Sequence, residues 1–127
     1  MQQRIDSPRA AAPGGPYSPA VRWNSMVFVS GQGPADTATG AVESAEFVQQ
    51  ARQVLANMDV LLRAAGSGRE RVLKVQAYLT DLDYFATFNQ VYGEFFEGCI
   101  APARTTVQVA GLPGGIKVEV DAIAYCE

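Results

Sequence analysis

The most informative absence in this sequence is histidine, which does not occur among its 127 residues. Without histidine, the Ser-His-Asp and Cys-His nucleophile systems and the commonest zinc ligand sets are excluded. Acid–base chemistry would have to fall to carboxylates, tyrosines, backbone groups or water. Phosphate-binding loops of the GxxxxGK and GxGxxG types are absent as well. We therefore expect neither a metal nor an organic cofactor.

Cysteine, runs of basic residues and long apolar runs are also scarce. Cys99 and Cys126 are the only cysteines and have no framework spacing, so we expect reduced thiols in an intracellular protein. The 10 basic residues form no run, and with 13 acidic residues the net charge is −3, which argues against nucleic-acid binding. The opening MQQRIDSPRA has no apolar signal region, and no apolar run approaches a membrane span. The sequence predicts a cytoplasmic protein without membrane contact.

What is present predicts one α+β domain over residues 1–127, with residues 1–14 as an extended or flexible lead-in. Apolar spacings of three and four indicate helices, and alternating runs indicate strands. The predicted elements are a strand or strand pair over 21–30 with a turn at Asn24-Ser25 and a buried strand at 26–30, a helix from Ser44 that stops at Gly66, a strand over 71–79, a helix capped by Thr80 that ends near Gly98, and strands over 105–110 and 116–124. This β(β)-α-β-α-β-β order predicts a mixed sheet with two helices on one face.

The face of the sheet opposite the helices is expected to carry few charges, with Gln76, Thr106 and Gln108 among its side chains. Charged residues make up only 18% of the chain, below the usual share of about 25%. A face of such mild polarity favours packing against copies of itself, so we expect a homo-oligomer.

The last two strands flank a Leu-Pro-Gly-Gly turn and are predicted to form a hairpin, with Arg104 and Glu119 together on the non-helical face. One interpretation of Arg104 is an exposed ion pair with Glu119 or Asp121, worth at most about 1 kcal/mol. The other is a clamp for a ligand carboxylate, because a guanidinium offers a planar fork of donors. Glu119 is correspondingly either a solvated strand charge or a group that orients water.

Four further residues each have a structural and a functional interpretation. Tyr17 is either a plug on the sheet or a site residue. Ser30 and Gly31 either begin a loop or let a ligand approach the backbone closely. Asn89, among the aromatic residues of the second helix, is by pattern alone a polar position on its solvent side.

Four segments together resemble the RidA/YjgF family of small enamine/imine deaminases, from about Gly15 to Tyr125. They are GPYSPAV, VFVSGQGP, QARQVLANMDVLLRAAG and PARTTVQVAGLPGGIKVEVDAIA. The resemblance implies a fold similar to that of chorismate mutase and a homotrimer whose sheets form a central barrel with ligand clefts between subunits. It also implies cofactor-independent hydrolysis of reactive 2-imino and 2-enamino acids to 2-keto acids and ammonia.

The resemblance assigns roles to individual residues. Arg104 stands where the family binds the substrate carboxylate. Tyr17, Ser30, Gly31 and Glu119 match cleft positions near the ligand or its water.

Two further positions bear on the shape of the cleft. Asn89 matches a cleft asparagine from the neighbouring chain. Thr106 stands in the substrate pocket where many members carry cysteine, and is expected to alter its shape. The segment 97–101 is short for the family, which bears on substrate size.

The implied mechanism has Arg104 holding the carboxylate while Glu119, with the hydroxyl of Tyr17 or a backbone carbonyl near Gly31, positions water for attack on the iminium carbon. Two alternatives use the same cleft: a regulatory module that binds a small carboxylic acid without turnover, and a deaminase specialised for a larger aminomuconate. A nuclease role ranks last, because the chain is acidic and has no histidine.

Overall fold

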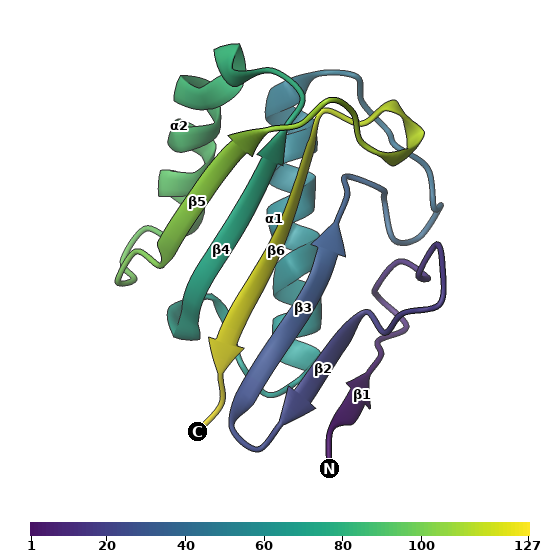
Figure 1. Ribbon diagram of the computed structural model, residues 1–127, viewed down its shortest axis with the longest axis vertical. Helices are drawn as coiled ribbons and strands as arrows, with labels where there is room; N and C mark the ends of the chain where they lie inside the picture. The colour runs from purple at the N-terminus through teal and green to yellow at the C-terminus, as the bar shows by residue number, and fades with distance from the viewer.

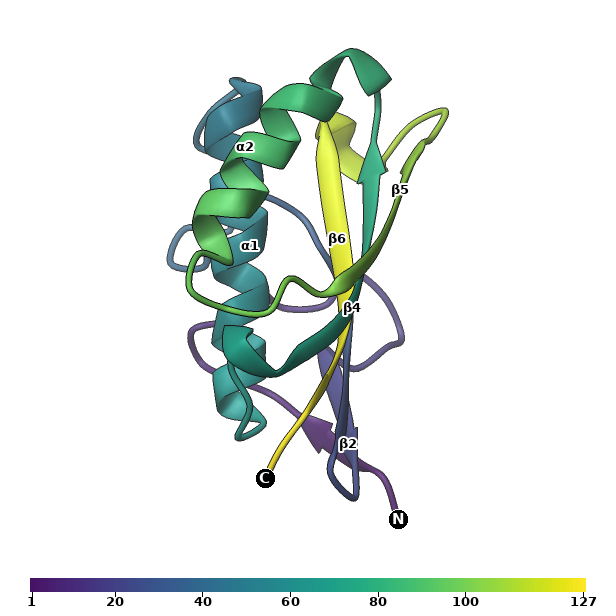
Figure 2. The ribbon, with the colours of Figure 1, turned by 90° about the vertical axis from the view of Figure 1, so that its left-hand side faces the viewer.

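The computed structural model describes residues 1–127 as a six-stranded mixed sheet with both long helices on one face (Figures 1 and 2). The strands lie in the order β1-β2-β3-β6-β4-β5, and every pairing is antiparallel except β4 with β5. The elements are β1 (Gln3–Ile5), β2 (Ala20–Trp23), β3 (Met26–Gln32), α1 (Phe47–Ala64), β4 (Val72–Leu79), α2 (Phe85–Phe95), β5 (Ala103–Gln108) and β6 (Val118–Tyr125), with single 3₁₀ turns at Arg69–Arg71, Leu82–Tyr84 and Pro113–Gly115. The predicted α+β class and the placement of the helices are confirmed.

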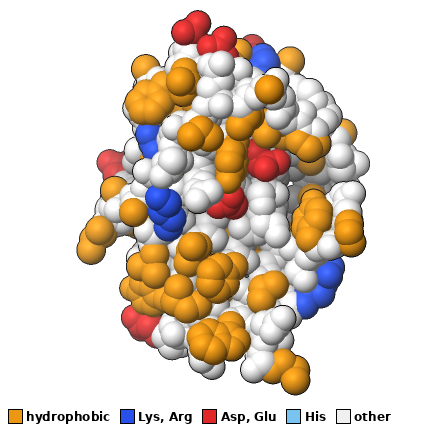
Figure 3. All heavy atoms as spheres, in the orientation of Figure 1, with side chains coloured by type: hydrophobic (Ala, Val, Ile, Leu, Met, Phe, Trp, Pro, Cys, Tyr) orange, Lys and Arg blue, Asp and Glu red, His pale blue; other side chains and the backbone are white.

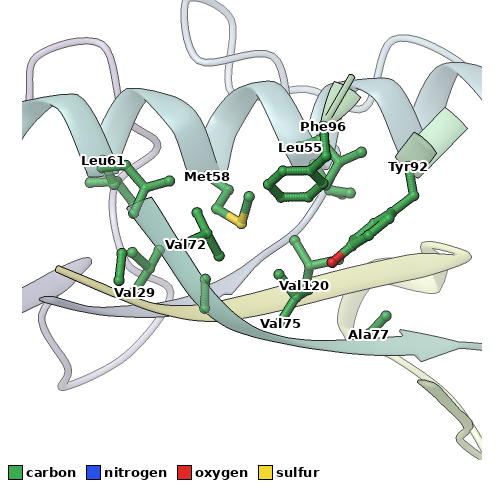
Figure 4. Close-up of a cluster of buried hydrophobic side chains, with 14 of the residues drawn as sticks. Val29, Leu55, Met58, Leu61, Val72, Val75, Ala77, Tyr92, Phe96 and Val120 are labelled. Atoms are coloured by element: carbon green, nitrogen blue, oxygen red, sulfur yellow. The ribbon is translucent and has the colours of Figure 1, made fainter. Parts of the chain in front are cut away.

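Helix α1 follows its predicted stripe and lies across the sheet. Its apolar positions at spacings of three and four are buried against β3 and β6, and the core continues from α1 through β4 to α2 (Figure 4). Gly66 stands just after the helix with φ of +85°, a conformation that glycine adopts without steric cost, so the predicted stop is confirmed. No helix of the chain combines the length and the apolar character that a membrane span requires.

The predicted turn at Asn24-Ser25 joins β2 to β3, with Asn24 at a φ of +53°. Strand β3 is half-buried rather than fully buried as predicted. Val27 is buried under the helices, whereas Phe28 is 45% exposed on the open face. The lead-in contributes β1 at the edge of the sheet beside β2.

The predicted hairpin of the last two strands is wrong, because β4 lies between them (Figure 1). After α2 the chain returns parallel to β4 and forms the edge strand β5, as a β-α-β crossover requires. The segment 109–117 then passes the end of β4, where the N–H groups of Val109 and Thr80 donate to the carbonyls of Leu79 and Lys117. Strand β6 enters the middle of the sheet because every second residue is apolar and is buried there.

The start of the second helical segment also differs by one residue from its prediction. The N–H of Thr80, the residue after β4, donates to the carbonyl of Lys117, the residue before β6, so Thr80 is bonded to that segment and does not cap the helix. Asp81 is the cap instead, and its carboxylate accepts from the N–H of Asp83 at 2.8 Å. The aromatic face of α2 is only partly buried: Phe88 is fully buried, whereas Phe85 is 41% exposed.

The sheet face opposite the helices is uncovered within the chain. Figure 3 views this face and shows apolar side chains gathered on its lower part and acidic groups nearer its centre. Trp23, Phe28 and Val107 are each at least 40% exposed there. Thr106 and Gln108, predicted for this face, pair with buried residues of β4 and so lie on the helix side.

Candidate functional site

The predicted site residues fall into two groups that the sheet separates. The register places Arg104 opposite the buried Val75, on the helix side, and Glu119 opposite Tyr78, on the open side. The expectation that Arg104 and Glu119 share a face is therefore wrong. It assumed that the apolar side chains of β5, such as Val107, point to the helices, whereas Arg104 and Thr106 do so. We name the groups the Arg104 half-site, made of Asn89, Arg104 and Thr106, and the Glu119 half-site, made of Tyr17, Ser30, Gly31 and Glu119.

Aromatic rings and one amide surround the guanidinium of Arg104. Its Cζ lies 5.6, 5.4 and 4.7 Å from the ring centres of Phe85, Phe88 and Tyr92, within the range of cation–π attraction. Its Nη2 donates to Oδ1 of Asn89 at 2.5 Å. Asn89 thus reaches β5 with its amide oxygen, although the residue is exposed to solvent as its position in the helical pattern predicts. This hydrogen bond joins Asn89 to Arg104 of its own chain, so the two side chains lie together within one copy.

Arg104 forms no ion pair within the chain, since all five ion pairs involve other residues. The interpretation as a partner of Glu119 or Asp121 is excluded within one chain by their opposite faces. A guanidinium has five N–H donors, of which Asn89 occupies one. The remaining donors are available for a ligand carboxylate.

Two hydroxyl groups close to Arg104 are buried without a hydrogen-bond partner, those of Thr106 and Tyr92. Thr106 lies two residues along β5 and points to the same side as Arg104. The Tyr92 ring reaches from α2 towards Val120 of the sheet (Figure 4), and burial, opposed by Arg104, raises its pKa to about 12. Tyr92 therefore keeps its proton and can act as a hydrogen-bond donor. Sequence reasoning missed its place beside Arg104, because the helical spacing of Tyr92 indicated only a residue of the hydrophobic core.

A β-bulge shapes the Glu119 half-site. The register of β3 against β6 shifts between Val29 and Gln32, so Ser30 and Gly31 together face the single residue Asp121. A bulge of this kind bends the strand and changes the direction of its neighbours. The bulge brings the backbone of β3 close to the face of β6 that carries the carboxylates of Glu119 and Asp121.

Gly31 lets the carboxyl group of Glu119 lie against the backbone of β3. A β-carbon at Gly31 would stand 2.5 Å from Oε2 and 2.9 Å from Cδ of Glu119, closer than real contacts allow. Gly31 thus does allow a close approach to the backbone, and the group that approaches it is the Glu119 side chain of the same protein. Glu119 itself makes no ion pair.

Ser30 ties the loop that carries Tyr17 to the sheet. Its hydroxyl donates to the carbonyl of Ser18 at 2.7 Å, and its N–H donates to the carbonyl of Pro19. The hydroxyl of Tyr17 accepts from the N–H of Gly14 at 3.1 Å, and its ring is 48% exposed. Ser30 therefore positions Tyr17, and Tyr17 is not a buried plug.

A cavity of about 280 Å³ lies beside this half-site, with Tyr17, Gly31 and Glu119 in its wall. The loop after β3 forms part of its wall, and α1 holds this loop in place. Asn57, a buried polar residue of α1, donates to the carbonyls of Gly33 and Ala35 at 2.9 and 2.8 Å. Sequence reasoning did not single out Asn57, although a polar residue in an apolar helical stripe was a usable signal.

Asp121 belongs to the same surroundings and was also missed as a site residue, although strand alternation places it on the face of Glu119. Burial, and secondarily the charge of Asp121, raises the pKa of Glu119 above its ordinary value. Burial raises the pKa of Asp121 too, while a hydrogen bond from Tyr78 acts against this rise. No three carboxylate or cysteine side chains gather into a group that could hold a metal ion.

Comparison with known proteins relates the whole chain to one family. The family model described as Endoribonuclease L-PSP matches residues 7–126. A RutC family protein of Pyrococcus horikoshii is 42% identical over 127 residues, covering 100% of both chains. The 2-iminobutanoate/2-iminopropanoate deaminase of mouse is 39% identical over 98% of this chain and 91% of its own.

A solved structure agrees with these sequence relationships. The crystal structure of Escherichia coli TdcF with bound serine superposes with a TM-score of 0.95 at 40% identity, covering 98% of this chain and 99% of that one. Because the match in sequence and fold spans nearly every residue, the chain belongs to the RidA/YjgF family.

Proposed function

We propose that this chain hydrolyses reactive 2-imino and 2-enamino acids to 2-keto acids and ammonia without a cofactor. The observation that carries the proposal is Arg104, a guanidinium held by Asn89 and three aromatic rings but free of any carboxylate partner. Such a fork binds a small carboxylic acid in a bidentate manner. The mouse relative, whose name specifies two 2-imino acids, supports the same substrate class.

We further propose that the catalytic cleft combines halves from two copies in a homotrimer. Within one chain the sheet separates the Arg104 half-site from the Glu119 half-site. The uncovered sheet face with its exposed Trp23, Phe28 and Val107 offers the apolar surface for such an assembly. Each copy then contributes Arg104 to one cleft and Glu119 to another.

In the proposed mechanism, Arg104 binds the carboxylate, and Thr106, which points to the same side of β5, shapes the substrate pocket beside it. The Glu119 carboxyl and the Tyr17 hydroxyl, which lies in the wall of the same cavity, orient a water molecule towards the iminium carbon. Attack forms a C–O bond while the π electrons of the C=N bond move to nitrogen, and the attacking water gives one proton to bulk water, which leaves a neutral carbinolamine. Its C–N bond then breaks to release ammonia and the keto acid. An iminium carbon is already electrophilic, so orientation supplies much of the acceleration.

The test is a coupled assay in which an amino-acid oxidase generates 2-imino acids and semicarbazide traps the imine that survives. Wild-type protein should reduce the trapped product. Arg104→Ala should lower kcat/KM by about 10- to 150-fold, because a charge-assisted contact is worth roughly 1.5–3 kcal/mol. Arg52→Ala, which removes an exposed arginine of α1, serves as the matched control and should retain full activity.

A second candidate, a module that binds a small carboxylic acid without turnover, is favoured by the TdcF structure with bound serine. In that case the wild type would leave the trapped imine unchanged for every amino acid tested. Titration calorimetry with serine and with 2-ketobutyrate would still show saturable binding that Arg104→Ala abolishes. Normal turnover by Arg104→Ala would overturn both candidates.

A further inference from the structure

Glu119 and Asp121 form a pair of carboxylates on the open face of the central strand β6. They are two residues apart, about 6.6 Å along the strand, and both point to the same side. A second hollow of about 430 Å³ has both carboxylates in its wall together with Tyr17, Ser30 and Gly31. Asp121 therefore lines the same space as the Glu119 half-site, opposite the bulge of β3.

The two carboxylates differ in their hydrogen-bond partners. The Tyr78 hydroxyl lies 2.9 Å from Oδ2 of Asp121 and 2.8 Å from the side-chain amide of Gln76. A tyrosine hydroxyl has one proton, so only one of these contacts can be a donation by Tyr78. When Tyr78 donates to an ionised Asp121, the Gln76 amide turns its NH₂ group to donate to the Tyr78 oxygen.

This chain from Gln76 through Tyr78 to Asp121 stabilises negative charge on Asp121. No protein group donates a hydrogen bond to the carboxylate of Glu119, which lies instead against Gly31. When two nearby carboxylates share a partly buried site, the one with the better donor ionises first. On the basis of the proposed function, we propose that Asp121, held by Tyr78, is a positioning residue that keeps a proton on Glu119 for transfer to the departing amine.

The proton balance of the step is complete. The Glu119 O–H protonates the amine nitrogen of the carbinolamine, the C–N bond breaks, and ammonia leaves. The carbinolamine hydroxyl becomes the new carbonyl and its proton returns to Glu119. The cycle regenerates the acid and consumes only water.

Few other titratable groups face Glu119. Tyr78 on β4 and Asp121 on β6 have been described, and Tyr17 lies across the hollow. Strand β3 contributes only Ser30 and Gly31, which do not titrate. In the proposed cleft, Arg104 of the neighbouring copy is neutralised by the substrate carboxylate. Besides burial, Asp121 is therefore the group of the chain that acts on the proton of Glu119.

The test uses two variants, Asp121→Asn and Tyr78→Phe, and two readouts. The first readout is the pH dependence of kcat/KM. The value of kcat/KM should fall as the pH rises and Glu119 loses its proton. Asp121→Asn removes the neighbouring charge, so the fall should occur at lower pH. Tyr78→Phe lets Asp121 compete for the proton and should move the fall in the same direction. Tyr125→Phe, on the same face of β6, is the matched control and should leave the profile unchanged.

The second readout is a ¹³C NMR titration of the Glu119 carboxyl, which does not depend on turnover. Its midpoint should move to lower pH in Asp121→Asn and in Tyr78→Phe and should stay in place in Tyr125→Phe. An unchanged midpoint in Asp121→Asn overturns the inference even if the enzyme is active. If imine hydrolysis is absent but the midpoint moves, the coupling of the pair stands and its catalytic use fails with the proposed function.

Discussion

Arg104 illustrates how a charged residue is prepared for a ligand. Three aromatic rings and the Asn89 amide restrict the guanidinium without neutralising it. Less side-chain entropy is then lost when a carboxylate binds. At the residue scale the other half-site uses the opposite device, a missing side chain: Gly31 leaves room for the Glu119 carboxyl.

Gly31→Ala should therefore displace Glu119 and lower kcat/KM by about 10- to 100-fold, because small misplacements of a catalytic group are costly. The matched control is Gly93→Ala in α2, where an added β-carbon meets nothing within 4 Å. This control should keep full activity and gain about 0.5–1 kcal/mol of stability. Full activity of Gly31→Ala would show that the position of Glu119 is unimportant.

Glu119 should also make stability depend on pH. Burial and the charge of Asp121 raise the pKa of Glu119 above the ordinary 4.5. The contribution of protonated Glu119 to the free energy of unfolding is therefore fully present below pH 4.5 and is lost as the pH rises through the pKa of the folded state. Glu119→Gln cannot ionise and should have a higher free energy of unfolding than the wild type at neutral pH. Urea unfolding should show this gain disappear at acidic pH; a gain of equal size at every pH would contradict the argument.

At the scale of elements, the bulge of β3 and the capped turn before α2 position the two half-sites. The bulge opposes Asp121 and brings Gly31 to Glu119. The capped turn begins α2, whose Asn89 reaches Arg104 on β5. Both devices are local irregularities, and both lie next to residues of the candidate site.

Asp81→Ala should cost about 1 kcal/mol of stability, the usual effect of removing an N-cap side chain. Thr80→Ala should cost less, because the Thr80 hydroxyl makes only a long contact of 3.4 Å with the carbonyl of Lys117. Thermal unfolding of the two variants measures the difference. An equal or larger loss in Thr80→Ala would restore Thr80 as the cap.

At the scale of the whole molecule, the sheet divides the site, so one folded chain does not bring Arg104 and Glu119 together. The helix side of the sheet is closed by its own core, whereas the other side is uncovered. The proposed trimer makes use of both facts, since it covers the open face and pairs each half-site with its complement.

Mixing two impaired variants, Arg104→Ala and Glu119→Gln, should restore activity. In a randomly mixed trimer, a cleft is intact when a Glu119→Gln copy supplies its Arg104 and an Arg104→Ala copy supplies its Glu119. When equal amounts are refolded together, each condition holds for half of the clefts, so about a quarter of wild-type activity should be recovered. Each variant refolded alone is the control and should keep its reduced activity. No recovery from mixtures in which mass spectrometry detects mixed trimers would place the two half-sites in one copy.

Sequence alone determined the features that depend on near neighbours. The stripe of α1, its stop at Gly66, the turn at Asn24-Ser25 and the alternation of β6 follow from periods of 3.6 and 2 and from backbone preferences. The family resemblance, carried by motifs, is confirmed as well.

Tertiary structure decided which strands pair and therefore which face each site residue occupies. β5 and β6 each alternate, but alternation only divides a strand into two phases and does not say which phase meets the helices. The insertion of β4 between them depends on hydrogen bonds between residues far apart in sequence, such as those of Thr80 with Lys117. For that reason Arg104 was placed on the wrong side of the sheet, and the role of Asp121 beside the bulge became visible only in the folded chain.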